Sequence, residues 1–521
     1  MNKSTVNPWI VAIVVSLATF MEVLDTTITN VSLSHIAGSL GSSQIEASWV
    51  ITSYLVANAI ILPLSGWLAS GLGRKRYFMI SIGLFTFFSF LCGTAQTLSA
   101  LIIFRILQGI GGGGLQSIQQ AIVLDAFPPD QRGVVFGISG VTLIFAPIIG
   151  PTLGGWITDT YTWHWIFLIN IPVGLSTLIL IQFIVSDPPH AQSKGFSHID
   201  WIGLILIIIG IGSLQIMLDQ GQQKDWFNSH FIFMLGIMSF CFLIAAIFWL
   251  LKQDNPIVNI RLLKDRSFSI GCSLIFVVGF LLYSSTTLLP VLLQSLFGYT
   301  ATLSGLVITP GGLSVLILMP LCGKLVQYIH ARVLARIGLI MIAIGLFLTH
   351  NLTPELNYEY FVLLRITQVI GIPFLFIPVS ALAYQHIAQE DNNKASGIFA
   401  LARNLGGSFG IALTWTYFQQ QQQIQFHELV EHINPYNPLL QEGIVTIQQR
   451  LMELGIPTIR ASEQSLALIY KKLIYQANLL SYENTFLILS GFSLLATLLT
   501  FYAPKNATID GKNHPISHDS H

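Results

Sequence analysis

The sequence has very little charge. Only 9% of its 521 residues are Asp, Glu, Lys or Arg, and its mean hydropathy is +0.68. A soluble protein of this size would carry about a quarter charged residues, so the composition excludes an ordinary soluble domain. The formal net charge is zero, which gives no reason to expect a nucleic-acid partner.

Reactive signatures are also scarce. The cysteines all fall inside apolar stretches, where we expect small packing residues rather than disulfides or metal ligands. These cysteines are Cys92, Cys241, Cys272 and Cys322. No GxxxxGK[ST] pattern occurs, so no ATP site is expected. Segment 427–432, HELVEH, places its histidines five residues apart and does not match HExxH. We therefore expect a protein that is not an enzyme and uses no metal or cofactor.

Long apolar runs are abundant, and each is long enough to cross a bilayer. We predict an all-α polytopic membrane protein with fourteen transmembrane helices and a retained first span. The predicted spans are 9–33, 46–70, 77–97, 99–123, 133–158, 165–185, 201–219, 230–251, 267–290, 300–328, 337–351, 360–387, 395–418 and 482–503. Basic clusters such as 74–76 lie in loops on one side, whereas the short loops of the other side hold only Lys224. This asymmetry predicts that both termini are cytoplasmic.

An internal repeat is visible. Segment 63–68, PLSGWL, returns as 320–325, PLCGKL, and 105–108, RILQ, returns as 365–368, RITQ. The offsets, 257 and 260 residues, are nearly equal, which predicts two duplicated six-helix bundles with a site between them. We expect an N-terminal bundle at 1–200, two inserted helices at 201–251, a C-terminal bundle at 252–503 that includes an outer loop at 419–481, and a cytoplasmic tail at 504–521.

The first span carries two carboxylates on one helix face. Glu22 and Asp25 are three residues apart, and acids inside a membrane helix mark proton or ion pathways. Arg105 lies at a similar depth in the fourth span, about 9–12 Å below the outer surface at 1.5 Å per residue. We predict that Asp25, Glu22 and Arg105 carry proton coupling. The alternative is that Arg105 braces helices and Glu22 only lines a cavity.

Other residues inside spans are candidates for the substrate cavity and for gating. The cavity candidates are Glu22, Asn30, Gln108, Gln116, Arg403 and Asn404. Residues 146–155 hold prolines and glycines that must bend or loosen the fifth span, and the glycine run 109–114 permits close helix packing. The gating and structural candidates are Gly66, Arg74, Pro147, Gly150, Pro151, Gly154 and Gly155.

Five segments together resemble the major facilitator superfamily, and within it the 14-span drug:H⁺ antiporters of the EmrB/QacA family. The segments are 24–31, 66–76, 105–109, 150–155 and 165–174. Segments 211–219 and 434–438 are further similar to the EmrB branch. The resemblance implies a proton-coupled multidrug antiporter that exports hydrophobic toxic compounds by alternating access, with the proton gradient as its energy source. It also implies a Gram-negative inner membrane, a periplasmic adaptor of the EmrA type and a TolC-like outer-membrane channel.

The chain departs from the family pattern in its second loop. Ser70 stands where an acid is usual and Gly71 where a base is usual. The conformational lock that the acid provides in the family is therefore weakened here or supplied by other residues. Asp125, in the next loop on that side, is a candidate to pair with the basic cluster 74–76. The alternative function is a dedicated proton-coupled exporter or symporter of one metabolite or siderophore. The outer loop 419–481 is expected to hold two short helices and to dock a partner outside the membrane.

Overall fold

The computed structural model describes residues 7–128, 132–188, 193, 195, 200–431, 433 and 436–504. Across these residues the regular structure is helical, without strands. The predicted tail beyond residue 504 lies outside the described residues, as do His432, Asn434 and Pro435 of the motifs noted above.

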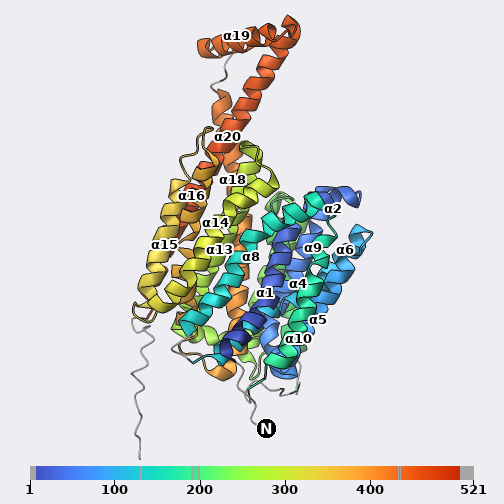
Figure 1. Ribbon diagram of the computed structural model, residues 1–521, viewed down its shortest axis with the longest axis vertical. Helices are drawn as coiled ribbons and strands as arrows, with labels where there is room; N and C mark the ends of the chain where they lie inside the picture. Colours follow the sequence, from blue (N-terminus) through green and yellow to red (C-terminus); the bar gives the residue numbers. More distant parts are fainter. Residues whose placement is uncertain are drawn as a thin grey trace, which may run out of the picture.

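The helices form an N-terminal half, an inserted pair and a C-terminal half along the chain (Figure 1). The N-terminal half contains α1 (Pro8–Val31), α2 (Leu33–Ser39), α3 (Gln44–Ala47), α4 (Trp49–Leu72), α5 (Arg74–Cys92), α6 (Leu98–Gly112), α7 (Leu115–Ala126), α8 (Arg132–Thr160), α9 (Trp165–Leu168) and α10 (Asn170–Ile184). The inserted pair is α11 (Trp201–Gln220) and α12 (His230–Lys252). The C-terminal half contains α13 (Arg266–Leu296), α14 (Ala301–Leu325), α15 (Ala331–Leu348), α16 (Tyr358–Val369), α17 (Ile372–Ala383), α18 (Asn392–Glu431), α19 (Pro438–Glu453), α20 (Thr458–Ala496) and α21 (Leu499–Tyr502).

The polytopic all-α class is confirmed. Among the described residues, 12 helical segments are long and apolar enough to cross a membrane. The long helices α8 and α18, which are not among those 12, fall at the predicted fifth and thirteenth spans. The count of fourteen therefore stays a prediction.

Polar residues set the ends of the helices. The Asn7 side chain accepts a hydrogen bond from the Trp9 amide at the start of α1, and Asp265 accepts one from the Phe268 amide at the start of α13. Such caps satisfy amide groups that have no partner within the helix. Gly73 separates α4 from α5 with φ +89°, a conformation that suits glycine.

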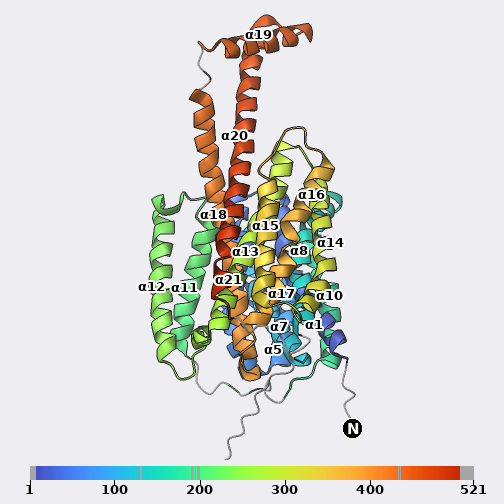
Figure 2. The same cartoon turned by 90° about the vertical axis from the view of Figure 1, so that its left-hand side faces the viewer.

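The two halves meet along α8 with α14 and along α4 with α18, and the inserted helices stand at the edge with α11 against α4 (Figure 2). Glycines allow these close approaches. A Cβ at Gly66 of α4 would lie 2.8 Å from the backbone carbonyl oxygen of Asn393 at the start of α18. A Cβ at Gly154 of α8 would lie 3.2 Å from the Ile28 carbonyl oxygen of α1.

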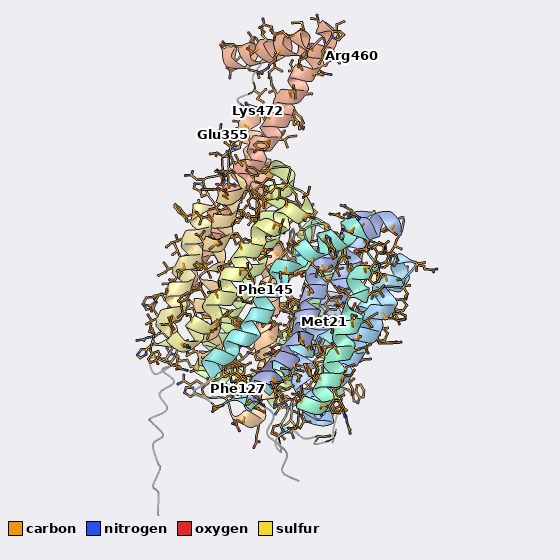
Figure 3. The ribbon with its side chains drawn as sticks, in the orientation of Figure 1. Met21, Phe127, Phe145, Glu355, Arg460 and Lys472 are labelled. Carbon is orange, nitrogen blue, oxygen red and sulfur yellow. The ribbon has the colours of Figure 1, made fainter. Side chains whose placement is uncertain are left out.

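The outer segment 419–481 differs from the prediction of a loop with two short helices. Helix α18 continues to Glu431 and α20 already begins at Thr458, so together they form a helical arm crossed at its end by α19 (Figure 1). Figure 3 labels Arg460 and Lys472 along this arm. The span boundaries were set by hydropathy, whereas residues 419–423 are glutamines that favour helix and contain no breaker. Gln422 then donates to Asn478 at 2.5 Å, joining the two helices.

The fourth and twelfth spans break at matching places. Gly113 and Gly114 separate α6 from α7, and Ile370 and Gly371 separate α16 from α17. Each break follows the repeated Arg-x-x-Gln segment, so the repeat seen in the sequence extends to the path of the backbone.

Candidate transport site

A buried ion pair lies in the N-terminal half. Arg105 Nη1 lies 2.5 Å from Asp25 Oδ2, and both side chains are fully buried. The other carboxylate oxygen, Oδ1, accepts hydrogen bonds from Gln108 at 3.1 Å and Asn170 at 2.8 Å. A charge buried this deeply is unfavourable unless it is paired and hydrogen-bonded, and this carboxylate has both kinds of partner.

Four helices position this ion pair. Asp25 comes from α1, Arg105 and Gln108 from α6, and Asn170 from the first turn of α10. The guanidinium lies 4.1 Å from the centroid of the Tyr54 ring on α4, and its Nε donates to the Val50 carbonyl oxygen at 3.1 Å. A change in charge at Asp25 therefore acts on contacts made by α4, α6 and α10.

Glu22 lies one turn away and belongs to a second polar network. Its carboxylate accepts hydrogen bonds from Asn58 at 2.9 Å and from Gln116 at 2.7 Å. Gln116 in turn accepts a hydrogen bond from Arg403 of α18. This network connects the N-terminal half to the C-terminal half, so the state of Glu22 bears directly on the contact between the bundles.

A cavity of about 570 Å³ lies between the halves. Glu22 lines it, and the half-exposed side chains of His35 in α2 and Asp159 at the end of α8 border it, 4.0 Å apart. Helix α2, which contains His35, lies on the same side of the bundle as α19 (Figure 1). The cavity thus opens toward the side that carries the arm.

The opposite side is closed by a buried polar contact between the halves. Arg74 forms an ion pair with Asp125, and Asn392 of the C-terminal half donates to the same carboxylate at 2.8 Å. The pairing between Asp125 and the basic loop is confirmed. Ser70 takes no part, since its hydroxyl donates to the Gly66 carbonyl oxygen of its own helix. Other residues thus supply the contact expected at the altered loop motif.

A neighbouring acid also holds this loop. Asp187, just after α10, accepts a hydrogen bond from the Lys75 amide at 2.8 Å. Burial raises the pKa of Asp187, while that hydrogen bond and the charges of Arg74 and Lys75 act in the opposite direction.

The predicted site residues separate into two groups. Gln116, Asn30, Asn404, Pro147, Pro151 and Gly155 line the cavity with Glu22. Gln108 and Arg403 do not line it, which differs from the prediction. Gln108 is fully buried beside Asp25, and Arg403 contacts the cavity residue Gln116 without lining the cavity itself. Depth along a helix was readable from the sequence, but the direction in which each side chain points was not.

Sequence reasoning also missed several site residues. Asn170, Tyr54 and Asn58 contact the two acids directly. Asn170 lies in the segment 165–174, but the pattern does not show that its amide reaches Asp25. Asp219, in α11, lines the cavity as well.

The C-terminal half repeats the ion-pair site without its acid. Arg365 is fully buried and donates to Ser285 at 3.2 Å and to Gln368 at 3.3 Å. Ser285 lies 260 residues after Asp25, the same offset that relates Arg105 to Arg365. Adding this offset of 260 residues to Asp25 gives Ser285, so the repeat in the sequence could have identified this position.

The fold and the buried polar centre define a polytopic membrane transporter built from two related bundles around a central cavity. Residues 15–411 match the Major Facilitator Superfamily, and the chain belongs to this family.

Curated relatives cover most of the chain. It is 41% identical over 83% of its length to the multidrug export protein EmrB of Haemophilus influenzae, covering 84% of that protein. It is 36% identical to EmrB of Escherichia coli K12, covering 95% of each chain. The fatty acid resistance protein FarB of Neisseria gonorrhoeae is 34% identical, with 92% of each chain covered.

Solved structures match the fold. The proton:xylose symporter XylE aligns with a TM-score of 0.60 at 15% identity, covering 96% of each chain. The human organic anion transporter MFSD10 aligns with a TM-score of 0.60 at 14% identity, covering 95% of this chain and 99% of its own. These likenesses show the shared architecture.

Proposed function

We propose that this protein is a proton-coupled antiporter that exports hydrophobic compounds by alternating access. The buried Asp25–Arg105 pair is the observation that carries the proposal. A carboxylate held against a guanidinium inside a membrane helix is a chemically suitable place to take up and release a proton. The names of the relatives, multidrug export and fatty acid resistance proteins, agree with an exporter of apolar molecules.

Protonation of Asp25 removes the negative charge that attracts Arg105. The guanidinium then keeps its contacts with the Tyr54 ring and the Val50 carbonyl but loses its counter-ion. The contacts of α1 with α6 and α10 weaken, which biases the equilibrium between the two access states. Tyr54 also donates to Glu22 at 3.4 Å, so the same tyrosine links the ion pair to the cavity wall.

Substrate acts on the same equilibrium from the cavity. Glu22 is connected through Gln116 to Arg403 of the other half. A compound that enters the cavity and displaces this network alters the contact between the halves. Proton and substrate then bias the same conformational change, which is the thermodynamic requirement for exchange.

The proposal includes the cellular setting. The chain lies in the inner membrane with both termini cytoplasmic, and its arm faces the periplasm. There α18, α19 and α20 present a surface for an adaptor of the EmrA type, which leads to a TolC-like outer-membrane channel. The opening of the cavity on the arm side is one of the two access states that alternating access requires.

Everted membrane vesicles with an acidic interior test the proposal. Adding a hydrophobic dye should dissipate the pH gradient with the wild-type protein and with Asp225→Asn, an exposed acid of an outer loop. Dissipation should fall to background with Asp25→Asn, because the asparagine cannot exchange a proton. Equal responses of wild type and Asp25→Asn would refute coupling through Asp25. A response to a single metabolite alone would favour the dedicated exporter, and the opposite sign of proton movement would favour a symporter.

A further inference from the structure

Asp219 belongs neither to the Asp25–Arg105 pair nor to the Glu22 network. It lies one residue before the end of α11, and that end of the helix is on the arm side of the bundle (Figure 2). Its Oδ2 atom accepts hydrogen bonds from Thr52 of α4 and, at 3.4 Å, from Gln220. Within the described part of the chain, no protein group donates to its Oδ1 atom and no cationic side chain lies within ion-pair distance. The neighbouring Lys224 instead directs its ammonium toward the Phe231 ring, 5.7 Å from the centroid.

The carboxylate of Asp219 borders two spaces. One is the central cavity, and the other is a side pocket of about 300 Å³ between α4, α11 and α18. The two share Asp219, Leu55, Gln215, Ser408, Ile411 and Trp415. The side pocket and the central cavity are therefore adjacent, and Asp219 lies on the boundary between them.

The lining of the side pocket has a distinct chemistry. It combines one carboxylate, the indole of Trp415, the aliphatic side chains of Leu55 and Ile411, and several amides. A carboxylate in a site of low dielectric attracts a cation strongly, and an aromatic ring adds a favourable contact with the same charge. The apolar side chains suit the hydrocarbon part of such a ligand.

The other acids around the cavity are already engaged. Asp25 is paired with Arg105, Glu22 is linked through Gln116 to Arg403, and Asp159 faces His35. Asp219 differs from all three because, within the described residues, no cationic side chain reaches it either directly or through its partners Thr52 and Gln220. An acid in a membrane helix without a cationic partner points to a ligand that supplies the charge.

We propose that Asp219 and Trp415 form a subsite for lipophilic organic cations, so that the inserted helices contribute substrate recognition. This inference rests on the proposed export function and names one substrate class for it. Asp219 meets the positive charge and Trp415 covers it, while the apolar groups remain against Leu55 and Ile411.

Binding to the purified full-length protein tests the subsite without requiring transport. Tetraphenylphosphonium is the cationic probe, and a neutral hydrophobic dye of similar size is the comparison. We expect Asp219→Asn to weaken binding of the cation by about tenfold or more, since it removes the charge, and to leave binding of the neutral dye unchanged. Asp219→Glu should retain most of the affinity for the cation, Trp415→Leu should weaken it, and Asp225→Asn should have no effect.

Three results would overturn the inference. The first is that the wild-type protein does not bind the cation, and the second is that Asp219→Asn binds it as tightly as the wild type does. The third is that Asp219→Asn, although monodisperse, loses binding of the cation and of the neutral dye equally. The last would show that Asp219 only fastens α11 to α4 through Thr52. The vesicle assay separates this outcome from failure of the proposed function. If cation binding depends on Asp219 but the vesicles show no proton exchange, the subsite stands and the proposed antiport is refuted.

Discussion

At the scale of single residues, the two buried arginines of the repeat differ only in what faces them. Arg105 meets the carboxylate of Asp25, whereas Arg365 meets the hydroxyls of Ser285 and Thr286. The duplicated architecture therefore retains the cation in both halves and the acid in one. This asymmetry confines the proposed proton site to the N-terminal bundle.

Ser285→Asp should supply Arg365 with the missing counter-ion. We expect this variant to keep or raise the melting temperature of the purified protein. Ser284→Asp is the control, because Ser284 is equally buried but is hydrogen-bonded to Thr414. A buried charge without a cation costs about 3–5 kcal/mol, so the control should unfold at a clearly lower temperature. Equal melting temperatures of the two variants would show that Arg365 does not recognise a carboxylate.

Asp187 provides a pH-dependent test outside the membrane spans. Because burial raises the pKa of Asp187 in the folded protein, the folded state binds this proton more tightly than the unfolded state. The contribution of Asp187 to stability is therefore greatest below the unfolded value of about 3.9 and falls as pH rises through the folded pKa. Asp187→Asn should reduce the dependence of the melting temperature on pH over that range, and the asparagine still offers an acceptor for the Lys75 amide. A profile identical to wild type would contradict this.

At the scale of helices, glycines determine which pairs can approach each other. Gly66 and Gly397 place α4 and α18 in backbone contact on the side opposite the arm, and Gly154 brings α8 against the backbone of α1 at Ile28. The first contact closes the cavity on that side together with Arg74, Asp125 and Asn392. Access to the cavity therefore depends on a glycine contact as well as on charge.

Gly66→Ala should destabilise this closed contact, because its Cβ would lie 2.8 Å from backbone atoms of Asn393 and Lys394. Overpacking of this kind costs about 1–3 kcal/mol, which corresponds to a population shift of roughly 5- to 150-fold. In a cysteine-free background, labelling of a cysteine introduced at cavity residue Asn30 from the arm side should slow. Gly83→Ala, where no atom lies within 4 Å of the added Cβ, is the control. Unchanged labelling in both variants would show that this contact does not set the access state.

At the scale of the whole molecule, the arm extends away from the bundle that contains the transport site (Figure 3). Its two long helices are held together near the bundle by Gln422 with Asn478 and by Phe426 with Tyr470, whose ring centroids lie 6.0 Å apart. The cavity and the ion pair involve none of these residues. The cavity and the ion pair are thus spatially separated from the arm.

Replacing residues 431–465 with a short linker should separate these two roles. We expect the shortened protein to dissipate the pH gradient in vesicles as the wild type does, because the cavity and Asp25 are intact. Resistance of whole cells to the same compounds should be lost, because the proposed surface for an adaptor is removed. Full resistance with the shortened chain would exclude the arm as a docking surface, and loss of vesicle activity would show that the arm supports the bundle itself.

Much of the fold was readable from the sequence, because membrane spans follow from apolar runs and a backbone in lipid must satisfy its own hydrogen bonds. The repeat of Arg105 as Arg365 predicted the two bundles, and matching depth brought Asp25 and Arg105 into one hypothesis. The helices α18 and α20 extend as a pair beyond the last two predicted spans, because hydropathy marks only the apolar run, whereas polar residues such as the glutamines at 419–423 also favour helix.

Tertiary structure alone decided which other polar residues join Asp25 and Arg105 and which line the cavity. The sequence by itself determined that acids and arginines lie within the membrane, since composition and spacing along a helix are local properties. It did not determine that Asn170 completes the shell of Asp25, that Gln108 belongs to the ion pair, or that Asp219 faces a pocket without a cation. Those facts depend on the rotation of each helix about its axis, which is set by packing against distant segments of the chain.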